Sequence, residues 1–230
     1  MRSEWIPASA AALVTGVMAL VLGQMLNPAG SESSPAAQMV VAAQYPGRWL
    51  AMSILYFGGA AALVLGMPAV MTLFSDRRGR GLGITGIGVF TVGCVGVGGL
   101  AALMLMFRAL ALQTLKVGPV ETNEIKLVTE SLKSSGVVIP LYFWVWAFIG
   151  GVALIGFGLF RSKTTPKWVP GLLMAFLALQ VVMPFLGQGT GARVVSAVGL
   201  ILLAGGFTGI ATTAAAPRTV GPVTHSLVRS

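Results

Sequence analysis

Long apolar runs separated by short polar segments dominate the chain. Each run holds roughly 20 residues with almost no charge, which is the length that a helix needs to cross the ~30 Å hydrocarbon core of a bilayer. Helices are expected rather than barrel strands, because the runs are too long and too uniformly apolar. The pattern predicts an all-α polytopic transmembrane bundle of six helices in one membrane domain, residues 1–213. The predicted helices cover about 6–26, 49–74, 83–112, 137–160, 169–186 and 194–213.

Two of the segments between these runs are long. Segment 27–48 is rich in Ser, Ala and Pro and reads as a loop with one apolar stretch. Segment 116–136 predicts a short extracytoplasmic helix between the third and fourth spans, since Pro119 suits an early helical position and Gly136 suits the end. Residues 214–230 form a polar tail.

Basic residues in two short segments set the predicted orientation. The segments SDRRGRG and RSKTTPK lie directly against helix ends, where the positive-inside rule acts most strongly. Placing both in the cytoplasm puts both chain termini and the polar tail there as well, in a bacterial inner membrane. The residues assigned to this topology are Arg77, Arg78, Arg80, Arg161, Lys163 and Lys167.

The five tryptophans agree with six spans. Trp5 and Trp168 fall at predicted inner helix ends and Trp49 at an outer end, depths where an indole keeps its N–H in contact with water. Trp144 and Trp146 lie deeper, in the outer half of the fourth span. Two residues apart, they do not face the same way on a helix. Packing or lipid contact is the favoured interpretation, and the alternative is that one of them lines an interior space.

Glycine spacing raises two competing hypotheses. Gly81, Gly83 and Gly86 match G-x-G-x-x-G, a dinucleotide-binding spacing. That fingerprint needs a strand before it and an acid about 20 residues later. Here an apolar helix precedes it and no acid follows before Glu121. We therefore expect no nucleotide and assign the glycines to close helix packing, which small residues permit in membranes. The assigned packing glycines are Gly58, Gly66, Gly79, Gly86, Gly93, Gly98, Gly205 and Gly209.

Composition strengthens the membrane prediction and narrows the chemistry. The 230 residues are 56% hydrophobic and 9% charged, whereas soluble domains carry about 25% charged residues. Mean hydropathy is +0.88. The net charge of +9 is spread over short clusters, which indicates lipid headgroup contacts rather than nucleic acid. With one cysteine, Cys94, and one histidine, His225, we expect no metal and no cofactor.

Ionisable or strongly polar groups inside membrane runs are functional candidates, and this chain has few. Arg108 either snorkels to the outer interface, the favoured interpretation, or is buried with a partner such as Glu121 or Glu124. Gln180 is the most unusual uncharged polar residue and also needs a partner. The candidate functional residues are Arg108, Gln180, Trp144 and Trp146.

The segment GFGLFRSKTTPKW, residues 156–168, leads from the fourth span through a basic loop and a proline into the fifth. It resembles the junction between helices 4 and 5 of small six-helix membrane proteins that are common in actinobacteria and catalogued as a domain of unknown function. The helix count and the long first outer loop fit this family as well. The resemblance implies a fold and a bacterial source, and the family has no established site residues to carry over.

These features predict an integral membrane protein without an evident catalytic site, and not an enzyme. The expected role is structural, accessory or sensor-type, with an unknown ligand. The alternative is a permease subunit of an export or immunity transporter driven by a partner ATPase, which would contact segment 76–81. Expected partners are membrane lipid and other membrane subunits or a second copy of the chain, but no nucleic acid.

Overall fold

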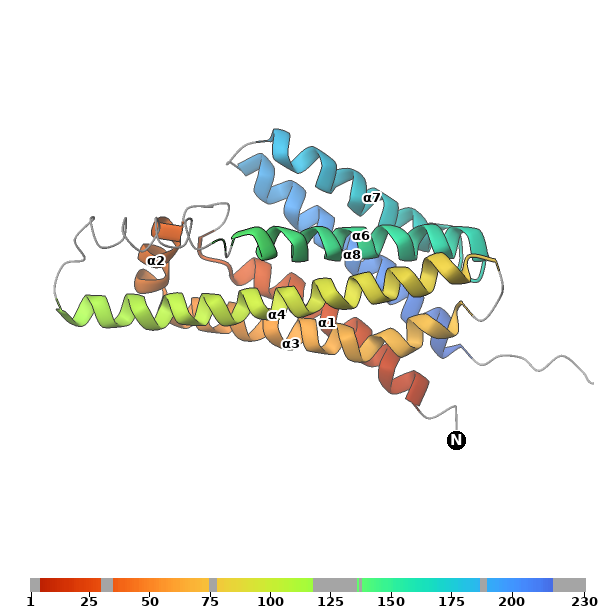
Figure 1. Cartoon of the computed structure of the whole chain (residues 1–230), viewed down its shortest axis with the longest axis horizontal. Helices are drawn as coiled ribbons and strands as arrows, with labels where there is room; N and C mark the ends of the chain where they lie inside the picture. The colour runs from red at the N-terminus through yellow and green to blue at the C-terminus, as the bar shows by residue number, and fades with distance from the viewer. Residues whose placement is uncertain are drawn as a thin grey trace, which may run out of the picture.

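Antiparallel helices make up the described chain, which contains no strand (Figure 1). The structure is a computed structural model that describes residues 5–29, 35–74, 78–117, 136, 138–186 and 190–216. The helices are α1 (Trp5–Leu26), α2 (Pro35–Gln44), α3 (Pro46–Thr72), α4 (Arg80–Val117), α6 (Val138–Ser162), α7 (Trp168–Val182) with the 3-10 turn η1 (Met183–Phe185), and α8 (Thr190–Ala215).

Five of these helices are long and apolar enough to cross a membrane, namely α1, α3, α4, α6 and α8. Only 28–39% of the residues in each apolar window are buried inside the protein. The remaining apolar surface faces outward, which water would not tolerate over so large an area. The described chain is therefore a multi-pass helical membrane protein. The 15-residue helix α7 is shorter, and η1 extends it toward Leu186.

The six longer helices pack side by side in a closed ring, in the order α1, α3, α4, α6, α7, α8 and back to α1. Helix α2 lies across one end of this ring, against α3 and α4. Figure 1 shows the start of α1, the end of α3, the start of α4, the α6–α7 turn and the end of α8 together at the other end. We call these the α2 end and the basic end.

Aromatic rings fill the interior of the ring of helices. The Phe90 ring of α4 lies 4.8 Å from that of Phe148 on α6 and 5.3 Å from that of Phe207 on α8, measured between centroids. Phe90 and Phe207 have no exposed surface. Leucines from the remaining helices, such as Leu13 and Leu173, complete the same buried cluster.

A proline in α3 is accommodated by a hydroxyl from α1. Pro68 has no N–H and crowds the preceding turn, so an interior proline normally costs hydrogen bonds. Ser9 Oγ donates to the Leu65 carbonyl at 2.9 Å and accepts from the Ala69 N–H at 3.0 Å. An unbroken helix would pair that carbonyl and that N–H with each other. The hydroxyl therefore satisfies both groups and also ties α1 to α3.

Some predicted element boundaries differ from the structure. Helix α4 extends beyond the predicted 83–112 at both ends, and α7 gives way to a 3-10 turn at Met183. Helix α2 falls inside segment 27–48, which was expected to be a loop. Buried Met39 and Ala42 explain it, because contacts with α3 and α4 stabilise a helix that its composition alone does not indicate. The predicted helix in 116–136 and most of the tail lie outside the described residues.

Candidate functional site

Glycines bring α4 and α6 into direct backbone contact. A Cβ added at Gly86 would lie 2.7 Å from the Ile155 nitrogen, and one at Gly151 would lie 2.5 Å from the Phe90 Cα. A Cβ at Gly93 would overlap the backbone of Phe148. These neighbours are backbone atoms and cannot rotate away. Together these residues define the α4–α6 contact, where any larger residue would push the two helices apart.

Four more of the predicted packing glycines also lie close to a neighbouring helix, two of them against backbone atoms and two against side chains. A Cβ at Gly66 would lie 2.8 Å from Leu13, and one at Gly79, where φ is +80°, would lie 2.6 Å from the Gly158 carbonyl oxygen. A Cβ added at Gly205 or Gly209 of α8 would lie 2.9 Å or 2.6 Å from side-chain atoms of α7.

Gly98 and Gly58 depart from the prediction. A Cβ added at Gly98 would make only an ordinary contact, 3.8 Å from the Phe57 side chain, and one at Gly58 would meet nothing within 4 Å. Its neighbour Gly59 faces α1 instead, opposite Gly16. One residue corresponds to about 100° around a helix, so the packing role belongs to Gly59.

The glycines of the G-x-G-x-x-G match lie in the first turns of α4. Leu73 and Phe74 form a turn before it, so no strand leads into the motif from the described residues. Gly83 packs against the Phe74 ring, Gly86 joins the α4–α6 contact, and Gly81 faces open space. Two of the three glycines therefore serve helix packing.

The basic residues assigned to topology gather at the basic end of the bundle. Arg78 and Arg161 line a shallow hollow of about 310 Å³ beside Gly79 and Leu82. Arg77 lies outside the described residues. The exposed members of the group are Arg78, Arg80, Arg161, Lys163 and Lys167.

Arg108 lies at the α2 end and is half-buried. Its Nε donates a hydrogen bond to the Pro46 carbonyl at 2.9 Å, which joins α4 to the start of α3. Its suggested partners Glu121 and Glu124 lie outside the described residues. Arg108 lies about 42 Å along the helix axis from Arg80. This distance exceeds the ~30 Å hydrocarbon thickness, so the two arginines cannot both lie inside the hydrocarbon core.

Trp49 corrects a prediction. It was expected at headgroup depth with a wet indole, but its side chain is 1% exposed. Its Nε1 donates to the Met104 carbonyl at 2.8 Å, and it packs in a small buried cluster with Ala42, Met52 and Ala111. Helix α2 completes that cluster, and the sequence did not reveal α2.

The remaining candidate functional residues lie in different parts of the bundle and do not form one site. Trp144 packs on α4, where a Cβ at Gly96 would overlap it and one at Gly99 would lie 3.5 Å from its ring. Trp146 is 67% exposed. Gln180 of α7 is half-buried against α8, with its Nε2 3.5 Å from where a Cβ of Gly199 would lie.

A polar network that sequence reasoning missed joins α1, α3 and α8. The Tyr56 hydroxyl donates to Gln24 Oε1 at 2.5 Å, and Gln24 Nε2 donates to Ser196 Oγ in a longer bond of 3.4 Å. Tyr56 and Ser196 are visible in the sequence as polar groups in apolar runs. Gln24 sits near the end of its run, where a polar residue is unremarkable, so no local signal links the three.

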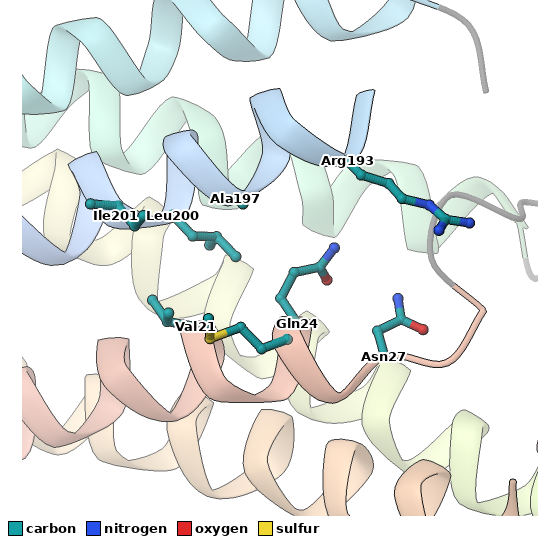
Figure 2. Close-up of a pocket in the computed structure, with 8 residues that line it drawn as sticks. Val21, Gln24, Asn27, Arg193, Ala197, Leu200 and Ile201 are labelled. Carbon is teal, nitrogen blue, oxygen red and sulfur yellow. The ribbon is translucent and has the colours of Figure 1, made fainter. Parts of the chain in front are cut away.

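This network borders an open groove between α1 and α8, with a volume of about 270 Å³. Figure 2 shows Gln24 and Asn27 reaching from the α1 side, with Arg193 extending from α8 above Asn27. The other part of the groove is apolar. The lining residues, which define the α1–α8 groove, are Val21, Gln24, Met25, Asn27, Arg193, Ala197, Leu200 and Ile201.

Among the residues that the structure describes, the polar part of the α1–α8 groove carries one positive charge, that of Arg193, and no negative charge. Arg193 lies near the start of α8, whose first turn carries no acidic residue and has the positive end of the helix dipole. The six acidic residues of the chain all fall outside the described segments. Within the described chain, Arg193 makes no ion pair or hydrogen bond to another residue.

Comparison of the chain with family models, curated proteins and solved structures finds no match. Among the described residues, no three His, Cys, Asp or Glu side chains come together as metal ligands would. Cys94 is buried in the core cluster. The structural features that bear on the function of this multi-pass membrane protein are therefore the α1–α8 groove, the basic end and the interior packing.

Proposed function

We propose that the protein is a six-span component of a bacterial inner membrane, with a structural, accessory or sensor role and no catalytic activity of its own. The sixth span is α7 with η1, residues Trp168–Phe185. At 1.5 Å per residue this segment is about 27 Å long, close to the ~30 Å hydrocarbon thickness. The resemblance of residues 156–168 to an actinobacterial six-helix family supports the bacterial assignment.

We infer that both termini face the cytoplasm. Five exposed basic residues, from Arg78 to Lys167, cluster at the end of the bundle where α1 starts and α8 ends. The positive-inside rule favours the cytoplasm for that end. Reporter fusions after Phe74 and after Leu115 test the orientation: we expect cytoplasmic activity at the first and external activity at the second, and the reverse pattern would contradict the proposal.

One observation carries the proposed role most directly. Phe90 stands between Phe148 and Phe207, so aromatic side chains occupy the middle of the ring of helices. A bundle filled in this way supports contact with partners or lipids at its surface rather than passage of a solute through its centre. The described hollows, at the basic end and between α1 and α8, lie at the periphery.

Native isolation tests this role. The tagged chain, extracted from its own membranes with the surrounding lipid, is expected to run in an assembly larger than a monomer. That assembly would contain either other membrane subunits or a second copy. A monomer at native expression level, with no companion protein, would contradict the accessory and structural role.

A permease subunit is the second candidate, and the hollow lined by Arg78 and Arg161 favours it as a contact for a cytoplasmic ATPase. Charge reversal at Arg77, Arg78 and Arg80 would then abolish ATPase co-purification while the orientation stays unchanged. Arg48→Glu, at the opposite end, is the matched control. If no ATPase co-purifies with the unaltered chain, the permease hypothesis fails.

A further inference from the structure

We propose that the α1–α8 groove binds one anionic phospholipid, with the headgroup phosphate at Arg193 and an acyl chain along Val21, Leu200 and Ile201. The inference rests on the proposed membrane role, and it names the ligand class that this role lacks. It follows from three features of the groove: where it lies between the helices, how its charge is placed, and how far it reaches into the membrane.

The groove lies between two helices whose closely packed glycines face other neighbours. Gly16 and Gly23 of α1 face α3, whereas Gly205 and Gly209 of α8 face α7. None of these four glycines faces the other helix of the pair, and the groove lies between α1 and α8 at the α2 end. Its volume of about 270 Å³ lies just below the ~300–1,000 Å³ of typical small-molecule pockets. That space suits a single chain rather than a bulky ligand.

The walls of the groove suit an acyl chain. Met25 and Ile201 on its flanks are 72% and 61% exposed, so the groove opens toward the surrounding lipid. Ile201 lies eight residues after Arg193 on α8, which is about 12 Å deeper along the helix axis. This depth is most of one ~15 Å leaflet of the hydrocarbon core. A chain entering beside Arg193 thus passes the polar part of the groove and then lies along apolar side chains.

The charge at the opening suits a phosphate. A guanidinium binds phosphate oxygens with two parallel N–H donors, and this geometry makes arginine a preferred phosphate ligand. The positive end of the α8 dipole acts in the same direction. Gln24 and Asn27 line the same polar part and carry amide groups. A free phosphate ion would use this polar part but would leave the apolar walls uncovered.

Lipid retention by the full chain tests the proposal. The purified protein is reconstituted in nanodiscs with equal phosphatidylglycerol and phosphatidylcholine and transferred to mild detergent. Bound lipids are then counted by native mass spectrometry. We expect selective retention of one phosphatidylglycerol. Arg193→Gln should reduce it about fivefold, the effect of losing one arginine near a membrane surface. Ile201→Trp, which fills the apolar part, should also reduce it with the charge intact.

Arg48→Gln is the matched control, because Arg48 is an exposed arginine of α3 at the same end but outside the groove. It should leave retention unchanged. Equal losses in Arg48→Gln and Arg193→Gln, or no loss in Arg193→Gln, would overturn the proposal. Displacement of the lipid by millimolar inorganic phosphate would also overturn it and indicate a free-anion site. Unchanged melting temperatures establish that the variants fold.

The lipid proposal and the proposed function can be rejected independently of each other. A larger native assembly without selective lipid retention would remove the lipid from the groove and leave the accessory role standing. Selective retention by a chain that remains monomeric would support the lipid site and contradict the accessory role.

Discussion

The α4–α6 contact and the α1–α8 groove both lie between antiparallel neighbours of the same ring, and they differ in the residues that face each other. Along α4–α6, Gly86, Gly93 and Gly151 allow backbone to meet backbone. Between α1 and α8, Gln24, Arg193 and Leu200 line an open groove at the α2 end. Lipid provides no hydrophobic force to close a gap between helices. Glycines therefore account for the close α4–α6 contact, whereas longer side chains line the groove at one end of the α1–α8 pair.

The largest expected effect comes from filling the α4–α6 contact. Gly93→Leu would place side-chain atoms inside the Phe148 backbone, which cannot move aside. We expect a loss of more than ~3 kcal/mol in the free energy of unfolding, and failure to accumulate in the membrane. Steric trapping or denaturant titration in bicelles measures the change.

Gly88→Leu is the control for this variant, because a Cβ there meets nothing within 4 Å. It should cost nothing measurable. If Gly93→Leu is tolerated as well as Gly88→Leu, the α4–α6 contact is not closed.

The next effect concerns the hydroxyl that bridges α1 and α3. Ser9→Ala leaves the Leu65 carbonyl and the Ala69 N–H without their partner in an apolar setting. We expect a loss of about 1–3 kcal/mol in unfolding free energy. Ser53→Ala should cost less, since Ser53 Oγ only donates to the Trp49 carbonyl of its own helix. Equal effects of the two variants would mean that Ser9 does not support the turn at Pro68.

Gly58→Ala separates a glycine that packs from one that does not. Its Cβ would enter open space, and alanine is favoured over glycine in a helix by about 1 kcal/mol. We expect a small gain in stability. Gly59→Ala, one residue along, should instead be destabilising, because its Cβ would lie 2.9 Å from the Gly16 carbonyl oxygen. A reversed order of thermal midpoints would show that α3 is rotated relative to α1.

The smallest expected effect is in the network behind the groove. Tyr56→Phe removes the bond to Gln24 and should cost about 0.6 kcal/mol, the average for side-chain hydrogen bonds between membrane helices. A double-mutant cycle with Gln24→Leu measures the coupling. Additive effects of the two substitutions would mean that the bond contributes nothing to holding α1 and α3 together.

The apolar runs predict where helices lie because length and charge depletion are local properties. They do not predict how each helix is rotated. Core-facing and lipid-facing positions are both apolar in a membrane, so the 3.6-residue pattern that marks a buried face in soluble proteins is nearly lost. This explains why Gly58 was assigned a packing role that belongs to Gly59. The seven-residue spacing of Gly79, Gly86 and Gly93, in contrast, correctly predicted that they share one face.

The candidate site was less predictable than the helices. Gln24 and Ser196 are 172 residues apart, and no local pattern joins them. Arg193 is one of 15 Lys and Arg residues in the chain, and its sequence neighbours do not mark it as part of a site. Trp49 has the composition and position of an interfacial anchor, and only the packing of α2 over it changes that interpretation. Tertiary contacts between distant segments thus carry the information that the sequence pattern lacks.

Paired spin labels give the most direct test of an open, lipid-filled groove beside a closed contact. In a Cys94→Ala background, one pair at Gly88 and Gly150 reports on α4–α6, at positions where a Cβ meets nothing within 4 Å. A second pair at Leu22 and Val198, exposed residues outside the groove lining, reports on α1–α8. Electron–electron distance measurements should give a narrow α4–α6 distribution in any nanodisc. The α1–α8 distribution should narrow when phosphatidylglycerol replaces phosphatidylcholine. A lipid-filled groove would be contradicted if the width of the α1–α8 distance distribution were the same in both lipids. A closed α4–α6 contact would be contradicted if the width of the α4–α6 distribution changed with the lipid.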